Sequence, residues 1–355
     1  PNSLNGLLNL AAPAQGRVEM PRLGVEAWAS EPKKDHEIMA ARTVRKTSPK
    51  TSKADAKQDN KLGKLPQWNL NDLYPGMDSP ELKRDLELAD ADCIGFERDF
   101  KGKLAELAKN APVHLADAVK RYGAIEDRLG RLGSYSGLVY AGNTTDPKIA
   151  KFYGDMNDRL TAAYLHLLFF GLELNRVDDA VLDAAMTEPA LGHYRPWLED
   201  IRREKPYQLE DRIEQLFHEK SVTAYSAWNR LFDETIAGLR FKVGGKELGI
   251  EQTLNFMQDP DGKKRKAASE ALAVTFKNNL RPFALITNTL AKDKEISDRW
   301  RGFEDVAGAR HLSNRVEPEV VEALVAAVRA AYPTLSHRYY KLKAKWFGRK
   351  TLAHW

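Results

Sequence analysis

Hydrophobic residues recur at intervals of three and four positions along most of the chain after residue 65, which is the pattern of amphipathic helices. Proline and cap residues supply candidate helix starts at Ser79-Pro80 and at Asp146-Pro147. We therefore expect a mainly α fold. Two helices should start at residues 80 and 318, and the others should cover 98–109, 115–133, 147–174, 177–186, 194–204, 263–280, 282–296 and 334–347.

The stretch 210–250 carries the clearest local pattern in the chain. One apolar stripe predicts a helix near Ile213, and a second predicts a helix that Thr223 or Ser226 caps and Gly238 ends. The second stripe should be buried against neighbouring helices, and it consists of Trp228, Leu231, Phe232 and Ile236. Truncation of Trp228 to alanine is therefore expected to be costly.

The apolar period changes from helical to alternating at Leu239, which predicts a β-hairpin closed by the two-residue turn Gly244-Gly245. In that register Phe241 faces Leu248 and Leu239 faces Ile250, while Lys242 faces Glu247 as an opposite-charge pair on the other side.

The net charge of +5 comes from one part of the chain. Residues 39–64 hold eight Lys or Arg and two Asp or Glu, whereas 65–355 is neutral, so we expect no nucleic-acid partner. Residues 1–64 lack a sustained apolar period and are expected to be a disordered tail, of which 1–38 is not native sequence. We expect the ordered chain to form an N-terminal helical domain over 65–250 and a second, incomplete helical lobe over 251–355.

Two His-Glu pairs resemble half of the helical zinc motif HExxH, which needs a second histidine four positions after the first. The pair His218-Glu219 has Val222 at that position, and His36-Glu37 has Ala40. We therefore predict no metal ligands and interpret His218 as a surface residue whose replacement by alanine is nearly silent. His166 has no partner at four-residue spacing and is interpreted as a core histidine.

No other catalytic pattern is present, since the sequence contains no GxSxG elbow, phosphate-binding loop or dinucleotide-binding turn. No apolar run is long enough to span a bilayer. The single cysteine, Cys93, excludes an intrachain disulfide, so we expect a cytoplasmic protein in which this thiol packs in the core. The residues alone thus predict no catalytic, cofactor-binding or metal-binding residue.

Several segments, taken in order, resemble the oligoendopeptidase F group of zinc metallopeptidases, relatives of thimet oligopeptidase. The first is WNLNDLYP, residues 68–75, and the most extensive is 194–241 with its W…LFDE helix and following strand. Between them lie LGRLGSYSGLVYAGNTTDP at 129–147 and FFGLELNRV at 169–177. The resemblance covers residues 65–355.

This resemblance implies a helical lobe beside a channel, short peptides as substrates, and a zinc ion held by HExxH and a later glutamate. None of those ligands is in this sequence, so the resemblance implies the N-terminal part of such an enzyme, ending before its catalytic zinc site and inactive as given. The alternative is a non-catalytic helical peptide-binding or scaffold protein.

Overall fold

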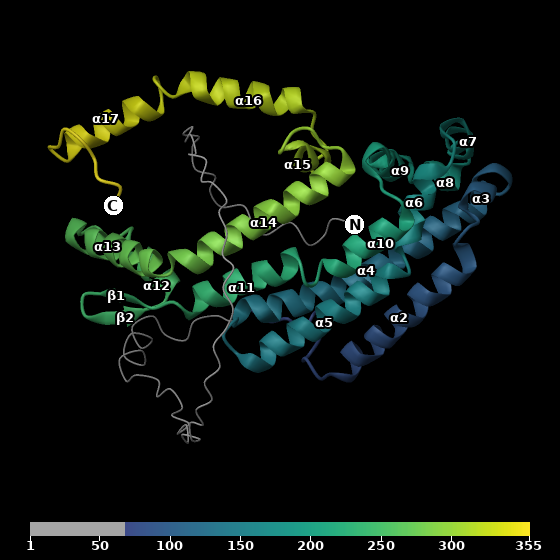
Figure 1. Ribbon diagram of the computed structural model, residues 1–355, viewed down its shortest axis with the longest axis horizontal. Helices are drawn as coiled ribbons and strands as arrows, with labels where there is room; N and C mark the ends of the chain where they lie inside the picture. Colours follow the sequence, from purple (N-terminus) through teal and green to yellow (C-terminus); the bar gives the residue numbers. More distant parts are fainter. Residues whose placement is uncertain (1–67) are drawn as a thin grey trace, which may run out of the picture. The chain divides into compact units, whose positions relative to one another are not determined.

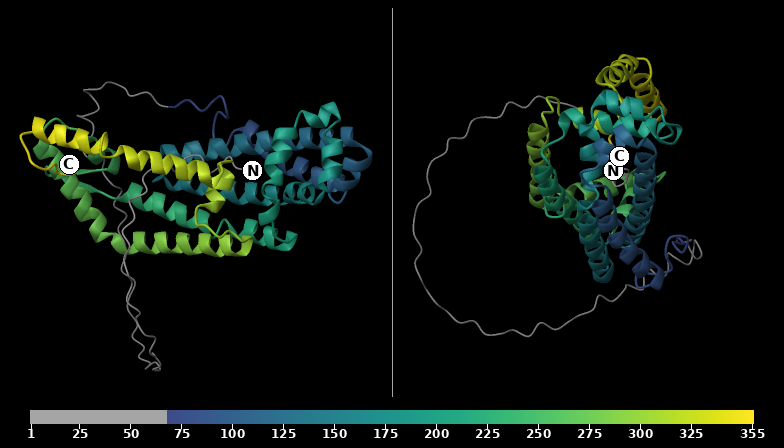
Figure 2. Two further views of the ribbon diagram at one scale, coloured as in Figure 1. Left: turned by 90° about the horizontal axis from the view of Figure 1, so that it is seen from above. Right: turned by 90° about the vertical axis from the view of Figure 1, so that its right-hand side faces the viewer.

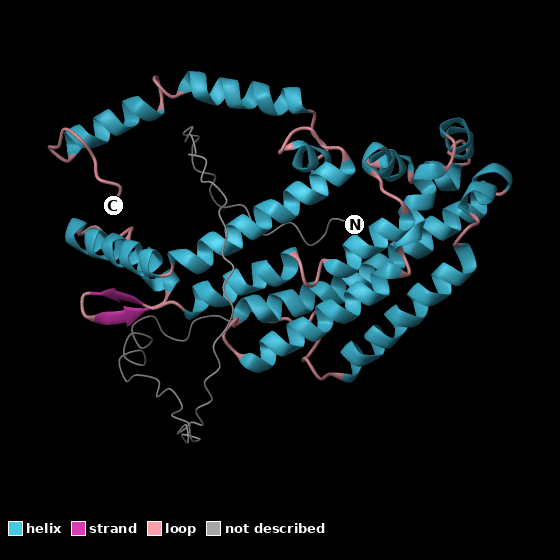
Figure 3. Ribbon diagram, viewed as in Figure 1, coloured by secondary structure: helices cyan, strands magenta, loops and turns pink. Residues whose placement is uncertain are grey.

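The computed structural model describes residues 68–355, within which Leu70–Trp355 forms one compact unit. This unit is helical apart from one two-stranded antiparallel sheet, and that sheet is the only one among the described residues (Figure 3). The prediction of a mainly α fold with a small β-hairpin is confirmed. The predicted tail 1–64 and the predicted non-native segment 1–38 lie outside the described residues.

The helices before the sheet fall into a long set and a short set (Figure 1). The long helices are α2 (Pro80–Phe100), α4 (Pro112–Gly142) and α5 (Pro147–Leu165), and α4 packs against both others. The shorter ones are α3 (Leu104–Asn110), α6 (Leu168–Arg176), α7 (Asp179–Ala185), α8 (Pro189–Gly192), α9 (Arg195–Arg202), the 3₁₀ turn η1 (Lys205–Tyr207), α10 (Asp211–Lys220) and α11 (Tyr225–Gly238).

The helices after the sheet are α12 (Ile250–Phe256), α13 (Gly262–Asn278), α14 (Leu280–Arg301), α15 (Gly308–Ser313), α16 (Pro318–Ala331) and α17 (Ser336–Trp346). Of these, α14 runs beside α11, and the views of Figures 1 and 2 agree on this pairing.

Two of the predicted helix starts have the expected caps. The Ser79 hydroxyl accepts a hydrogen bond from the Leu82 N–H at 3.3 Å, and Pro80 occupies the first helical position of α2. The Asp146 carboxylate accepts from the Lys148 N–H at 2.8 Å at the start of α5. The predicted cap at Thr223 or Ser226 is wrong, because α11 follows Ala224 without a side-chain cap.

The long helix predicted over 147–174 is interrupted. The chain leaves the α-helical pattern after Leu165 and resumes it at Leu168, with the His166 and Leu167 N–H groups bonded three residues back. His166 Nδ1 lies 2.5 Å from a carboxylate oxygen of Glu97 on α2, so a tertiary contact accompanies the break. The histidine side chain is 39% exposed, and its interpretation as a core residue is therefore wrong.

The main hydrophobic core extends from Tyr74 to Ile201 and is centred on aromatic side chains. The Phe170 ring lies 5.0 Å from that of Phe96 and 4.8 Å from that of Tyr122, and both phenylalanines are fully buried. Cys93 is buried beside them as predicted, and burial raises the pKa of its thiol to about 12. A thiol that stays protonated in a closed core is a packing residue.

The hairpin forms with the predicted turn and with two of the three predicted pairs. Strand β1 (Phe241–Val243) pairs with β2 (Lys246–Leu248), with Phe241 opposite Leu248 and Lys242 opposite Glu247. Gly244 and Gly245 have φ angles of 58° and 81°, a conformation that favours glycine. The predicted pairing of Leu239 with Ile250 is wrong, because Ile250 already begins α12, although both residues pack on the hairpin's apolar side.

A second buried cluster joins the hairpin to α13 through Phe241, Val243, Leu248 and Ala271. It is separate from the main core, which ends at Ile201. The hairpin thus packs with residues that follow it, whereas the sequence prediction assigned it to the domain before residue 250. The proposed division into 65–250 and 251–355 stays a prediction.

The apolar stripe of α11 is less covered than its spacing predicted. Leu231 and Phe232 are 45% and 39% exposed, and Trp228 is half-buried. Phe232 contacts the Phe283 ring of α14 at 5.7 Å, so one neighbouring helix shields the stripe in part. The expectation that this stripe is buried within the described chain is wrong, and truncating Trp228 should cost less than a core substitution.

Candidate functional site

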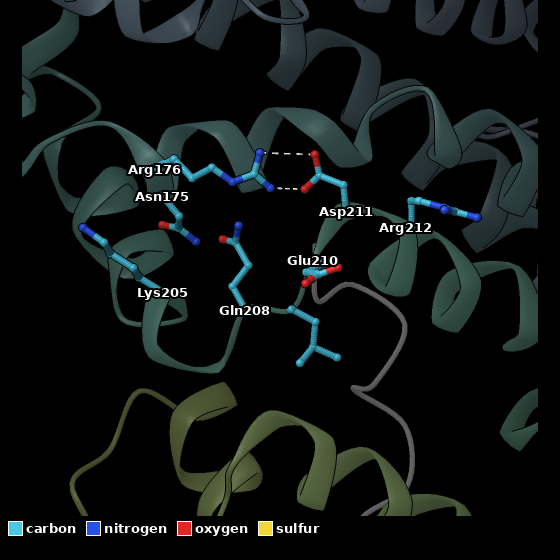
Figure 4. A pocket seen from close by; sticks show the side chains of 8 residues that line it. Asn175, Arg176, Lys205, Gln208, Glu210, Asp211 and Arg212 are labelled. Carbon is cyan, nitrogen blue, oxygen red and sulfur yellow. Dashed lines mark hydrogen bonds and ion pairs between the residues drawn. The ribbon is translucent and has the colours of Figure 1, made fainter.

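A surface groove of about 640 Å³ lies where α6 ends and α10 begins, and most of the residues that line it are polar or charged. Asn175 and Arg176 come from the last turn of α6, and Lys205 comes from η1. The remaining lining residues are Gln208, Leu209, Glu210, Asp211 and Arg212, which form the loop and the first turn of α10 (Figure 4).

An ion pair closes one side of the groove. The Arg176 guanidinium donates two hydrogen bonds to the Asp211 carboxylate, one of them at 3.2 Å (Figure 4). This bidentate contact ties the end of α6 to the start of α10. It also offsets one positive and one negative charge inside the groove.

Side chains from the groove region satisfy the carbonyl groups that the end of α6 leaves open. The Arg202 guanidinium donates to the backbone oxygens of Leu174, Asn175 and Val177 at 2.8–3.2 Å. The Gln208 side-chain amide donates to the Leu172 oxygen at 3.1 Å. These bonds hold α6, α9 and the loop after η1 in one arrangement.

Two amide oxygens in the groove have no hydrogen-bond partner. Asn175 is only 4% exposed, and its Oδ1 is buried and unpaired, as is the Oε1 of the half-buried Gln208. In the view of Figure 4 both amide groups lie between Lys205 and Asp211. Each unpaired buried acceptor costs about 1–3 kcal/mol, which a hydrogen-bond donor in the groove would recover.

The loop that carries Gln208 is fixed from behind by Arg301, the last residue of α14. Its guanidinium donates two bonds to the Glu214 carboxylate at 2.7 and 2.8 Å and a third to the Tyr207 backbone oxygen at 3.1 Å. Glu214 in turn accepts from the Leu209 N–H at 2.9 Å. We refer to Arg301, Glu214, Tyr207 and Leu209 as the Arg301 junction.

Two further features strengthen the Arg301 junction. The Phe303 ring stacks on Tyr207 with a centroid separation of 4.0 Å. Burial acts to raise the pKa of Glu214, but the hydrogen bonds from Arg301 and the Leu209 N–H outweigh it and place the pKa below its ordinary value. The carboxylate therefore stays charged and paired near neutral pH.

The structure places the His218-Glu219 pair on α10, outside the groove lining. The His218 Nε2 lies 3.0 Å from the Thr161 backbone oxygen on α5, and the side chain is half-buried. Because a carbonyl oxygen accepts, Nε2 carries the proton in this contact. The interpretation of His218 as a plain surface residue is wrong, since it links α10 to α5. The other pair, His36-Glu37, lies outside the described residues.

Within residues 68–355, no group of three or more His, Cys, Asp or Glu side chains is arranged to hold a metal ion. The prediction that the chain has no metal ligands stays a prediction. The groove residues were not predicted, because no spacing in FFGLELNRV distinguishes the buried, unpaired Asn175 from an exposed helical asparagine.

Known proteins are similar to this chain, and one family model matches the part that contains the groove. A family model described as Oligopeptidase F matches residues 173–241, which include the groove and end at the first residue of strand β1. Oligopeptidase PepF of Bacillus subtilis is 24% identical over 322 residues, covering 84% of this chain and 46% of the relative. An oligoendopeptidase F homolog of Borreliella burgdorferi is also 24% identical and covers 73% of this chain and 43% of the relative.

Solved structures share the fold. The crystal structure of oligoendopeptidase-F from Enterococcus faecium superposes with a TM-score of 0.67 at 18% identity, covering 77% of this chain and 54% of that one. A putative peptidase from Chlamydophila abortus gives a TM-score of 0.52 at 17% identity, covering 81% of this chain and 48% of that one.

The described residues thus have the helical fold of an oligoendopeptidase. The resemblance of the chain to the oligoendopeptidase F group, predicted from its sequence segments, is confirmed by the family model, the curated relatives and the fold. The chain spans about half of the length of the curated relatives it matches. Among residues 68–355, no helix is both long and apolar enough to cross a membrane.

Proposed function

We propose that this chain is the N-terminal helical part of a zinc-dependent oligopeptidase, that the substrates are short peptides, and that the 355 residues alone do not hydrolyse them. The observation that carries the proposal is the match to Oligopeptidase PepF over 84% of the chain, within which the family model covers the groove. We further propose a cytoplasmic location and no nucleic-acid partner.

The zinc ion that the family resemblance implies does not fit the residues present. The motif needs two histidines four positions apart, and His218 is followed by Val222 at that distance. No chemical step through a metal is therefore assigned to this chain. Its part in the proposed function is to supply helices and polar groups that bind a peptide.

The second candidate is a non-catalytic helical protein that binds peptides or serves as a scaffold. It is favoured by the absence of a catalytic pattern in the sequence and is compatible with the same groove. The two candidates differ in whether the whole natural protein hydrolyses the peptides it binds.

The 355-residue chain should hold less than one tightly bound zinc per molecule and should leave peptides intact. The test is elemental analysis after dialysis against metal-free buffer, followed by mass spectrometry of a mixture of short peptides incubated with the chain and added zinc. One retained zinc per chain together with peptide cleavage would contradict the proposal. Glu219→Gln is the matched variant, because it would remove any base supplied by the His218-Glu219 pair.

A further inference from the structure

We propose that the groove formed by the end of α6 and the start of α10 binds the main chain of an extended oligopeptide, with the side-chain amides of Asn175 and Gln208 contacting its peptide groups. This inference rests on the proposed function, because it assumes that peptides are the ligands. It adds a binding site built from residues that carry no catalytic motif.

The two amide oxygens are acceptors, and this indicates which kind of ligand fits the groove. Gln208 already uses its Nε2 group to donate to the Leu172 oxygen, so its Oε1 remains as an acceptor. The Asn175 Oδ1 is a second acceptor without a partner. A ligand that fits must bring N–H donors, which a peptide main chain does at every residue except proline. A simple carboxylate ion brings acceptors only.

The rest of the groove complements the carbonyl oxygens of a peptide. The first N–H groups of α10 have no partner within the helix, and they lie at Asp211 and Arg212 in the groove lining. The Lys205 ammonium and the exposed Arg212 guanidinium are further donors. Because Arg176 and Asp211 neutralise each other, the groove suits an uncharged main chain better than a highly charged ligand.

Access to the two oxygens requires a movement of one side chain. Both oxygens are covered by neighbouring atoms, but Gln208 is only half-buried and follows η1 on a short loop. The backbone on either side is fixed, since Tyr207 accepts from Arg301 and Leu209 donates to Glu214. A movement of the Gln208 side chain that opens the site breaks its hydrogen bond to the Leu172 oxygen, while the fixed backbone on both sides keeps the shape of the groove.

Binding of a defined peptide to the purified 355-residue chain tests this site. The probe is a short peptide of alternating alanine and serine with acetylated and amidated ends, compared by calorimetry with the same peptide carrying N-methyl groups on its backbone. The N-methylated peptide should bind at least tenfold more weakly, because it cannot donate to the amide oxygens. Equal affinities for the two peptides would overturn the proposal.

Substitutions assign the binding to the groove. Asn175→Leu and Gln208→Met should each weaken binding of the unmodified peptide about fivefold or more and reduce the difference between the two probes. Asn255→Leu and Gln258→Met change exposed amides of α12 and its flank, and they should leave both affinities unchanged. If Asn175→Leu does not fold, Gln208→Met and the N-methylated probe still decide the question.

The results distinguish a failure of the groove proposal from a failure of the proposed function. Peptide binding that is the same in Gln208→Met and in the unsubstituted chain would overturn the groove and leave the oligopeptidase proposal standing. Failure of the natural protein to hydrolyse peptides, with groove-dependent binding intact, would overturn the oligopeptidase proposal and support the groove.

Discussion

Phe170→Ala should lower the free energy of unfolding by about 3–5 kcal/mol, the range for removing a large buried aromatic side chain. Phe170 is fully buried, and its ring contacts Phe96, Tyr122 and Trp197 at centroid distances of 5.0, 4.8 and 6.3 Å. Those rings come from α2, α4 and α9, so the cavity left by the substitution would lie where several helices meet. The measurement is urea unfolding followed by circular dichroism.

The control for Phe170 is Phe232→Ala on α11. Phe232 is 39% exposed, so this substitution should lower the free energy of unfolding by only about 1 kcal/mol, because much of the side chain already faces water. Similar losses for the two variants would mean that the core has been assigned to the wrong helices.

Arg301→Ala should destabilise the chain by about 3 kcal/mol, since it leaves the Glu214 carboxylate buried without its partner. The Glu214 side chain is 10% exposed, and Arg301 also satisfies the Tyr207 backbone oxygen. The matched control is Arg299→Ala, two residues earlier on the same helix, where the arginine side chain is 62% exposed and pairs with Glu295. That variant should change stability by less than about 0.5 kcal/mol.

The effect of Arg301→Ala should depend on pH with a definite sign. Hydrogen bonds hold the pKa of Glu214 below its ordinary value in the folded chain, so the pair stabilises the fold above the unfolded pKa, about 4.3. The stability difference between the unsubstituted chain and Arg301→Ala should shrink as pH falls through the lower folded pKa of Glu214. A difference that stays constant into strong acid would show that the loss comes from packing alone.

The hairpin and several helix starts could be predicted because their determinants are local. Gly244-Gly245 fits a turn that needs two positive φ angles, and Pro80 and Pro147 fit first helical positions. The break at His166 could not be predicted in this way, since it coincides with a contact to Glu97, 69 residues earlier in the chain.

Burial of apolar stripes was predicted less well, because helical spacing identifies a stripe and does not identify what covers it. Phe170 is buried by helices from three parts of the sequence, whereas Leu231 on an equally regular stripe is 45% exposed. The groove was missed for a related reason. Asn175, Gln208 and Asp211 are ordinary polar residues in sequence, and only the end of α6 meeting the start of α10 brings them together.

The most direct test of the proposed function is peptide hydrolysis by the protein purified from its natural source, at its natural length. We predict that this protein cleaves short unstructured peptides, that a chelator abolishes cleavage, and that added zinc restores it. A natural protein that binds the same peptides but leaves them intact with zinc present would contradict the proposal and identify a non-catalytic peptide-binding protein.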